Sequence, residues 1–369
     1  MRFDIILVQL GSPQNASYFE IRRYLRDFLI SDRVVKREGV FHNVLWIIVL
    51  YFFILTLRPF KLRTIYKKLS DKFNGEMPLI KNFNLFVEKL CKRIAIDNKD
   101  DKNNSINIHG AYILSSPRIS DVIKKIKGQQ NKFDKVYLIP HYPLYSEPTN
   151  ALIFDEFSKH AKELNLNLDF DFRFIGSYHL AQFYVEQTSK LIDENINNWK
   201  KEEVIVDYLI LSYHGMPLKI SSYTLDNYLL AIEESFSLIK EKITSLDKKV
   251  IYYAFQSKFG YSEWTKPYLE NLIDDICDKH RKNKNKNKNK NDNNNNDSNV
   301  VRIAIATPGF LIDCLETLHE LANQLKSRFA KKGIELYVIS CLNYRDDWVD
   351  SYVKFLLSNL RECQKITIP

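Results

Sequence analysis

The sequence has few cysteines, and none of them form a paired motif. Its five cysteines lie scattered among 369 residues without a CxxC pair. This spacing argues against a structural zinc site, an iron–sulfur cluster or a disulfide framework, and it fits a reducing compartment. No GxGxxG or GxxxxGK(S/T) sequence occurs, so the phosphate-cradling glycine loops of dinucleotide and nucleotide enzymes are missing. These absences disfavour a nicotinamide- or ATP-dependent enzyme.

Positive charge is concentrated in one stretch of the chain. The formal net charge is +9, but residues 281–299 hold six basic residues against two aspartates, a local excess of +4. The remainder is only mildly basic, so no nucleic-acid partner is expected. The alternating lysine and asparagine residues of 282–299 cannot bury apolar surface, and we predict a disordered loop there.

One apolar run is long for a soluble protein. The chain passes directly from Met1 into an apolar strand pattern, which leaves no room for a signal or transit peptide and predicts a cytoplasmic protein. Residues 44–57 (VLWIIVLYFFILTL) carry no charge over 14 positions and precede Arg58, Lys61 and Arg63. A bilayer span needs roughly 20 residues, so we expect this apolar helix to be too short to span a membrane. Two interpretations remain: a buried core helix, or a helix in the membrane interface that makes a peripheral contact at the inner face of the cell membrane.

Short β-branched or aromatic runs alternate with helical patterns, which indicates βα units and parallel sheets. Strands are predicted at 3–9, 107–113, 135–140, 168–175, 207–213, 249–255, 301–307 and 335–341. Helices are predicted at 17–29, 119–127, 180–196, 228–244, 264–277, 312–331 and 348–358.

Eight strands exceed one comfortable doubly wound sheet in this length, so we divide them between two domains. The predicted fold class is α/β, with two Rossmann-like lobes, each a four-stranded parallel sheet flanked by helices, and a cleft between them. The first lobe is expected over residues 1–175 and the second over 176–340. The C-terminal segment, 341–369, is expected to pack on the first lobe.

Ligands of open α/β sheets bind beyond the carboxyl ends of the strands, so the residues that follow each apolar run are the candidates for a site. These positions are rich in aromatic residues and prolines around histidine and a few acids, a set that suits a flat apolar ligand with a proton or metal at its centre. The chain segments are 9–13, 140–146, 214–217, 256–260 with Trp264, and 308–320.

Three acids in the last of these segments share one helical stripe. Asp313, Glu316 and Glu320 stand at i, i+3 and i+7, within roughly a 60° arc at about 100° per residue. The apolar residues mark the opposite, buried side; they are Leu311, Leu315, Leu318, Ala322 and Leu325. The stripe is either a solvated acidic face or part of a site that borders the cleft.

His214 directly follows the predicted strand 207–213. His214 is followed by Gly215, which permits a sharp turn. A lone histidine is often structural, and its position at a strand end, facing a possible acid stripe across the cleft, leaves a structural role and a role in proton or metal chemistry equally open. Cys314 lies one residue off the acid stripe, toward the buried side, and is interpreted as a packing thiol.

At these positions the sequence resembles the ferrochelatase family of chelatases. The motifs that carry the resemblance occur in the family's order; they are LVQLGSP, RRYLRDFLISDRVV, PHYPLYS, LSYHGMP, FQSKFGYSEWTKP, TPGFLIDCLETLHE and CLNYRDDWV. Two features depart from the family pattern. Residues 111–117 (AYILSSP) replace the usual AMRYGxP, so the arginine–tyrosine pair is absent, and the lysine–asparagine insert is additional.

The resemblance implies a lyase that inserts ferrous iron into protoporphyrin IX to form haem b, the last step of haem biosynthesis. It implies His214 as proton acceptor and, with Glu316, as the catalytic and metal-binding pair. Asp313 and Glu320 would extend a carboxylate path for protons or iron. Tyr142, Tyr145 and Trp264 are candidate walls for the macrocycle, and Arg22, Arg23, Arg26 and Lys258 are candidate partners of its propionates.

The expected partners are a porphyrin and ferrous iron, the latter as substrate. No permanently bound cofactor is expected, and the C-terminal cysteine extension that holds an iron–sulfur cluster in some relatives is absent from this sequence. Two alternatives remain open. One is a chelatase for coproporphyrin III or another metal, and the other is a non-catalytic tetrapyrrole- or metal-binding protein.

Overall fold

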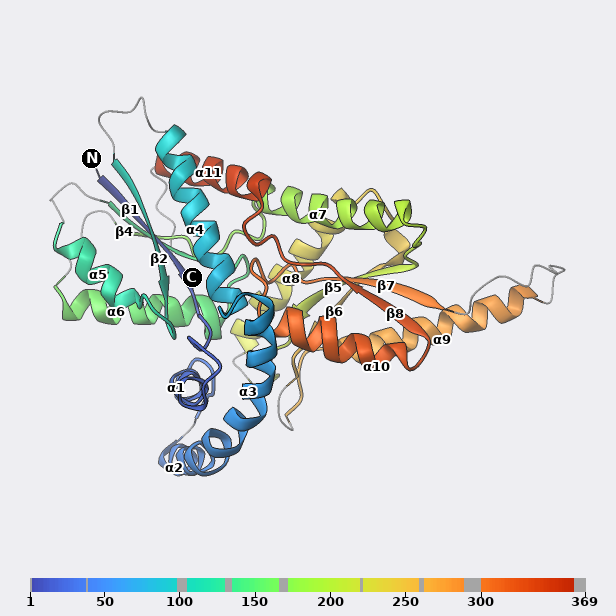
Figure 1. Cartoon of the computed structure of the whole chain (residues 1–369), viewed down its shortest axis with the longest axis horizontal. Helices are drawn as coiled ribbons and strands as arrows, with labels where there is room; N and C mark the ends of the chain where they lie inside the picture. The colour runs from blue at the N-terminus through green and yellow to red at the C-terminus, as the bar shows by residue number, and fades with distance from the viewer. Residues whose placement is uncertain are drawn as a thin grey trace. The chain divides into compact units, whose positions relative to one another are not determined.

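The structure is a computed structural model that describes residues 2–37, 39–97, 105–129, 135–165, 172–219, 222–258, 262–288 and 300–361. The chain forms two compact units: unit 1 comprises residues 1–179 and 342–369, and unit 2 comprises residues 180–341. Each unit contains one four-stranded parallel sheet with helices against it (Figure 1). The predicted α/β fold with two parallel sheets of four strands is confirmed.

The sheet of unit 1 has the strand order β2-β1-β3-β4. Its strands are β1 (Arg2–Gln9), β2 (Ser105–Tyr112), β3 (Lys135–Pro140) and β4 (Phe172–Phe174). Helices α5 (Ile119–Lys127) and α6 (Leu152–Glu163) pack together on one face, and α4 (Pro78–Asp97) and α11 (Asp346–Arg361) cover the other (Figure 1). Helix α1 (Tyr18–Leu29) follows the first strand, and the short wide turn η2 (Glu147–Ala151) precedes α6.

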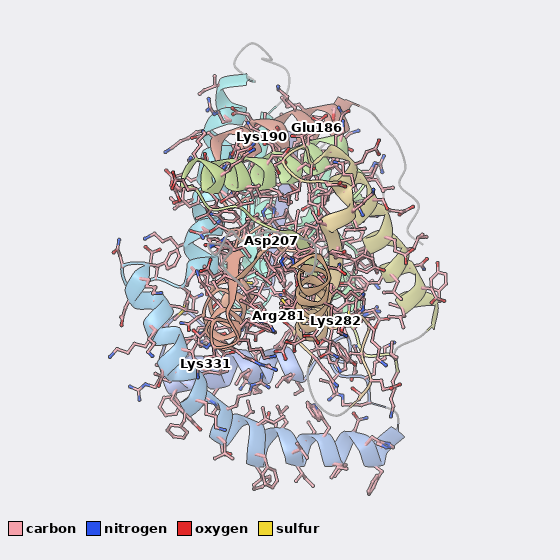
Figure 2. All side chains as sticks on the ribbon, turned by 90° about the vertical axis from the view of Figure 1, so that its right-hand side faces the viewer. Glu186, Lys190, Asp207, Arg281, Lys282 and Lys331 are labelled. Atoms are coloured by element: carbon pink, nitrogen blue, oxygen red, sulfur yellow. The ribbon has the colours of Figure 1, made fainter. Side chains whose placement is uncertain are left out.

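The sheet of unit 2 has the order β6-β5-β7-β8. Its strands are β5 (Tyr208–His214), β6 (Ile251–Gln256), β7 (Val301–Ala306) and β8 (Ile334–Val338). The helical segments are α7 (Gln182–Lys201), α8 (Ser222–Lys242), η3 (Lys248–Val250), α9 (Leu269–Lys288), η4 (Glu316–Leu325) and α10 (Lys326–Ala330). Figure 2 labels charged side chains of unit 2 that include Lys190 on α7, Asp207 directly before β5 and Arg281 on α9.

The strands form because they are apolar on both faces. β1 is buried from Phe3 to Gln9, and β5, β6 and β7 are buried over most of their lengths. Strands that are covered by helices on both sides read as continuous Val/Ile/Leu runs, which is why the sequence predicts them well. All eight predicted strands are present, and most ends differ from the prediction by a few residues; residues 168–171 of the fourth predicted strand lie outside the described part of the chain.

The apolar run 44–57 belongs to one long helix that is mostly exposed. Residues 39–72 form a continuous helix made of α2 (Gly39–Val49), a wide turn η1 (Leu50–Ile54) and α3 (Leu55–Lys72), and it is long and apolar enough to cross a membrane by length and composition. Only 11% of its most apolar 18-residue window is buried. The interpretation of this run as a buried core helix is therefore wrong, and so is the expectation that the apolar helix is too short to span.

One side of this long helix is attached to α1. Pro59 lies inside α3 and has no N–H, so the carbonyl of Leu55 loses its helical partner. Tyr18 Oη and Arg22 Nε of α1 donate to that carbonyl at 3.1 and 3.2 Å. Trp46 Nε1 donates to the Leu29 carbonyl at 3.1 Å. These hydrogen bonds therefore attach the long helix to α1, while most of its apolar side chains are exposed.

Other predicted helix limits also differ. Helix α9 begins at Leu269 rather than at Trp264, and it continues to Lys288. The prediction of a loop over 282–299 is thus wrong for 282–288, and residues 289–299 lie outside the described part of the chain. Helices α4 and α6 were not predicted at all.

Unit 1 buries a histidine whose ring makes no hydrogen bond within the described part of the chain. His141 follows β3 and is 0% exposed, and neither of its ring nitrogens has a hydrogen-bond partner in the described part of the chain. Its ring lies against Phe86 and Phe83, with centroids 4.6 and 5.4 Å away. Burial lowers the pKa of His141 to about 3. The ring therefore acts as a neutral packing group at neutral pH.

This burial predicts a specific acid sensitivity. The pKa of His141 lies near 6.5 when the chain is unfolded and near 3 when it is folded, so between these values only the unfolded state binds the proton. Each pH unit below about 6.5 should then remove roughly 1.4 kcal/mol of unfolding free energy. His141→Leu should abolish this part of the pH dependence, as measured by urea unfolding between pH 4 and 7. An unchanged acid slope in this variant, or an equal effect of the exposed-site control His42→Gln, would contradict the prediction.

Candidate functional site

The candidate site in unit 2 lies at the carboxyl edge of its sheet. His214 is the last residue of β5, an inner strand that pairs with β6 and β7. Gln256 ends β6 directly beside it, in register with His214. Because parallel strands end at the same edge, the residues that follow β5, β6 and β7 gather there.

The hydrogen bond of the His214 ring fixes its tautomer. Nδ1 lies 2.7 Å from the carbonyl oxygen of Gly215, and His214 itself is half-buried. A carbonyl oxygen can only accept, so Nδ1 carries the proton in the neutral ring. The lone pair of the neutral imidazole is then on Nε2. The ring can accept a proton or bind a metal ion through this nitrogen.

The turn after His214 is closely packed. Gly215 N–H donates to the Gln256 carbonyl at 2.9 Å, and Met216 N–H donates to Thr265 Oγ1 at 3.1 Å. A Cβ on Gly215 would lie 3.1 Å from the Gln256 carbonyl oxygen and 3.3 Å from Trp264 Cε3. A glycine is needed here because backbone and indole approach so closely.

Two aromatic rings flank the histidine. The centroids of Phe310 and Trp264 lie 6.4 and 6.5 Å from that of His214. Trp264 is only 9% exposed, and its Nε1 donates to Ser262 Oγ at 3.1 Å. Most of the indole therefore supports the turn, and a small part of its surface is available to a ligand.

Asp313 does not lie on an acidic helical stripe, contrary to the prediction. The helix begins at Leu315 rather than near 312, and Asp313 precedes it. Asp313 is 4% exposed, and its Oδ1 accepts from Thr317 Oγ1 at 2.9 Å and from Cys341 N–H at 3.2 Å. Its carboxylate thus ties the start of the helix to the segment after β8. Cys314 is buried as expected, and burial raises the pKa of its thiol well above the ordinary range.

The helix that follows is wider than an α-helix. Residues 316–325 form η4, in which each hydrogen bond spans five residues instead of four. Its buried line runs through Thr317, Leu321 and Leu325, at intervals of four, and Leu315, Leu318 and Ala322 are only partly buried. The predicted buried face is therefore partly wrong, because it assumed 100° per residue. Wide helical turns of this kind often occur at functional sites.

Glu316 and Glu320 remain together on this wide helix. Both are half-buried, and they are four residues apart, beside the buried line. Ser257, which follows β6 with φ +63°, donates its hydroxyl to Glu320 Oε2 at 3.1 Å. This bond brings a carboxylate of the helix to the edge of the sheet that carries His214. Ser257 was not predicted as a site residue, although it lies in the FQSKFG motif.

The other residues that were predicted to contact the porphyrin differ in how exposed they are. Lys258 is exposed, and its ammonium lies 4.8 Å from the centroid of the Tyr268 ring. In unit 1, Tyr142 is 8% exposed and accepts a hydrogen bond from Leu10 N–H at 3.3 Å, whereas Tyr145 is 36% exposed. Tyr142 therefore packs in the core of unit 1, and Tyr145 is accessible.

The arginines of α1, which were predicted to bind the propionates, make hydrogen bonds or ion pairs within the protein. Arg22 bonds the Leu55 carbonyl, Arg23 pairs with Glu20 at 2.6 Å, and Arg26 pairs with Asp27 at 2.7 Å. Ile113 and Leu114, which replace the family's arginine–tyrosine pair, are buried. This part of unit 1 presents apolar side chains where the family pattern places a cation.

No group of three or more His, Cys, Asp or Glu side chains within the described ranges could hold a metal ion. A tight cage is therefore not preformed among these residues. Nitrogen and carboxylate ligands that engage a metal one or two at a time bind ferrous iron only moderately. Such a set can pass a metal ion on rather than retain it.

Sequence comparisons agree on one family. The profile described as Ferrochelatase matches residues 3–284 and 290–360. A coproporphyrin III ferrochelatase of Enterococcus faecalis is 30% identical over 338 residues, which cover 91% of this chain and 92% of that protein. A ferrochelatase of Rhizobium etli is 28% identical over 349 residues (94% and 90% covered), and one of Francisella tularensis is 29% identical over 348 residues (94% and 92%).

A solved structure gives a weaker likeness. A multi-domain protein of Deinococcus radiodurans, described as structurally similar to chelatases, superposes with a TM-score of 0.42 and 9% identity. The match covers 95% of this chain and 54% of that one. At this score the likeness adds nothing to the strand orders described above.

Proposed function

Because the chain belongs to the ferrochelatase family, we propose that it inserts ferrous iron into protoporphyrin IX to form haem b. The observation that supports this proposal most directly is the half-buried His214 ring, whose Nδ1 proton is committed to Gly215. Metal insertion requires two pyrrole protons to leave the macrocycle, and Nε2 is the nitrogen that would accept one of them.

Two glutamates near His214 are proposed to move protons or the metal ion. Glu320, held by Ser257, and Glu316 on the same helix are proposed to carry protons or ferrous iron along the edge of the sheet. Asp313 is proposed to hold the start of this helix in place, since its bonded Oδ1 is occupied by Thr317 and Cys341. His214 and Glu316 are the proposed metal-binding and catalytic pair.

We propose protoporphyrin rather than coproporphyrin III as the substrate because of the apolar side chains of unit 1. Coproporphyrin III carries more propionate groups and is the more water-soluble substrate. This chain has buried Ile113 and Leu114 in place of the family's arginine–tyrosine pair, and it exposes a long apolar helix beside α1. The relative from Enterococcus faecalis, named for coproporphyrin III, makes that porphyrin the second candidate.

A direct assay distinguishes the two substrates. We expect purified protein, incubated anaerobically with ferrous iron, to convert protoporphyrin IX faster than coproporphyrin III, as followed by the loss of free-base porphyrin absorbance. The opposite ranking would assign coproporphyrin III as the substrate. Porphyrin binding without any insertion would favour a carrier.

His214→Ala should lose insertion while it still binds porphyrin. Apolar contact supplies most of the affinity for the ring, whereas removal of the proton acceptor should reduce turnover by about 10²-fold or more. Binding is followed by quenching of porphyrin fluorescence, and turnover by absorbance. Retention of near-normal turnover would remove His214 from the mechanism.

We further propose that the exposed helix of residues 39–72 rests on an anionic lipid surface. Large apolar side chains project from it and from the adjacent α1; the most exposed are Val40 (80%), Phe19 (77%), Phe41 (75%), Phe52 (71%), Leu57 (62%) and Phe60 (62%). Exposed cations follow them at Lys61, Arg63, Lys67 and Lys68. Apolar insertion beside a basic flank is the pattern of interfacial helices. The bonds to α1 favour a helix that lies on the surface over one that crosses it.

Ile48→Lys with Phe52→Lys should weaken this contact without unfolding the protein. These side chains are 44% and 71% exposed, so the free energy of unfolding should change by less than about 1 kcal/mol. Flotation with phosphatidylcholine–phosphatidylserine vesicles should fall relative to wild type.

The control variant is Ile205→Lys with Leu230→Lys, which adds two lysines at exposed positions of unit 2 (67% and 54%) and should float normally. Unchanged flotation of the helix variant would contradict lipid binding. Flotation that resists both high salt and carbonate washing would indicate a spanning helix instead.

A further inference from the structure

The direction of the Gly215 carbonyl decides which nitrogen of His214 carries the proton. That carbonyl belongs to the peptide unit that joins Gly215 to Met216, and it can accept from Nδ1 only while the turn keeps its present orientation. The orientation in turn depends on the preceding peptide unit, which consists of the His214 carbonyl and the Gly215 N–H. Both peptide units must therefore be held.

Hydrogen bonds hold each of these peptide units. In the first, the Gly215 N–H donates to the Gln256 carbonyl at 2.9 Å, and the His214 carbonyl accepts from Tyr228 Oη at 2.8 Å. In the second, the Met216 N–H donates to Thr265 Oγ1 at 3.1 Å, and the Gly215 carbonyl accepts from His214 Nδ1 at 2.7 Å. Tyr228 comes from α8, whereas the other bonds come from β6, the turn itself and the segment before α9.

Tyr228 is placed rigidly enough to perform this task. Its side chain is 6% exposed, and burial raises the pKa of its hydroxyl far above the ordinary range, so the hydroxyl remains a donor. A buried carbonyl that loses its donor costs free energy, which makes the turn prefer orientations that keep this bond. The tyrosine does not belong to any of the strand-end motifs.

We propose that Tyr228 is a positioning residue for the reaction: by holding the His214–Gly215 peptide unit, it keeps the proton of His214 on Nδ1 and the lone pair on Nε2. The consequence for turnover rests on the proposed function, whereas the consequence for the tautomer does not. Without the tyrosine hydroxyl the peptide unit can rotate, the Gly215 carbonyl moves away from Nδ1, and the proton is free to occupy either nitrogen.

A second buried tyrosine provides a matched control. Tyr184, from α7, is 0% exposed and donates its hydroxyl to the Pro308 carbonyl at 3.0 Å, after β7. Its removal also leaves a strand-end carbonyl without a donor in the same unit, but it touches neither peptide unit that holds His214. Tyr184→Phe and Tyr228→Phe therefore each remove one hydrogen bond from a tyrosine hydroxyl to a carbonyl, buried in the first case and partly buried in the second, and they differ in their effect on His214.

The test measures the tautomer and the kinetics together. In two-dimensional ¹⁵N–¹H spectra of the imidazoles of the full chain, recorded at a pH where the ring is neutral, the His214 signals are assigned by their loss in His214→Asn. Wild type and Tyr184→Phe should show one tautomer with the proton on Nδ1. Tyr228→Phe should show both tautomers and a kcat for iron insertion at least about tenfold lower, with little change in KM for the porphyrin.

Thr265→Val, which releases the second peptide unit at a different position, should resemble Tyr228→Phe and provides a second test if that variant does not fold. A single Nδ1–H tautomer in both variants would overturn the proposal. Mixed tautomers in the variants of a wild-type protein that does not insert iron would support the positioning and contradict the proposed function, so the two failures are distinguishable.

Discussion

A carbonyl oxygen can accept a hydrogen bond but cannot donate one, and the arrangement around His214 depends on this rule. The Gly215 carbonyl determines the position of the ring proton, and neighbouring backbone and side-chain bonds determine the direction of that carbonyl. The close approach of Gln256 and Trp264 makes the space for a side chain at position 215 tight. The unprotonated nitrogen of the His214 ring is thus specified mainly by backbone geometry, with aromatic rings at its sides.

Much of the fold could be predicted from the sequence, because strands buried on both faces appear as continuous apolar runs. Helix α4 shows what can be missed: Phe83, Phe86, Leu90 and Ile94 are buried at helical spacing, but the surface that covers them includes α11, which lies more than 250 residues later. The extension of α9 through Lys288 had no apolar signal, since alternating lysine and asparagine have no helical period. This extension continues the helical hydrogen bonding of the preceding turns.

The candidate site was predictable in part. Strand ends and motif order pointed to His214, Glu316 and Glu320, and the structure places them in one unit, at or beside the edge of one sheet. Asp313 was misplaced because the helix begins at Leu315, after it, and the buried face was partly wrong because residue spacing does not reveal which hydrogen-bond pattern a helix adopts. Ser257, Thr265 and Tyr228 act through bonds to other groups, and such roles become visible only when distances are known.

The proline in α3 couples the long apolar helix to its surroundings in a way that depends on solvent. In water, the Leu55 carbonyl released by Pro59 could be hydrated, and its bonds to Tyr18 and Arg22 would contribute little net free energy. In a medium of low dielectric constant no water competes, and loss of the same bonds would cost several kcal/mol. The attachment of this helix to α1 should therefore become stronger as water is removed around it, so that immersion in hydrocarbon would stiffen the joint rather than loosen it.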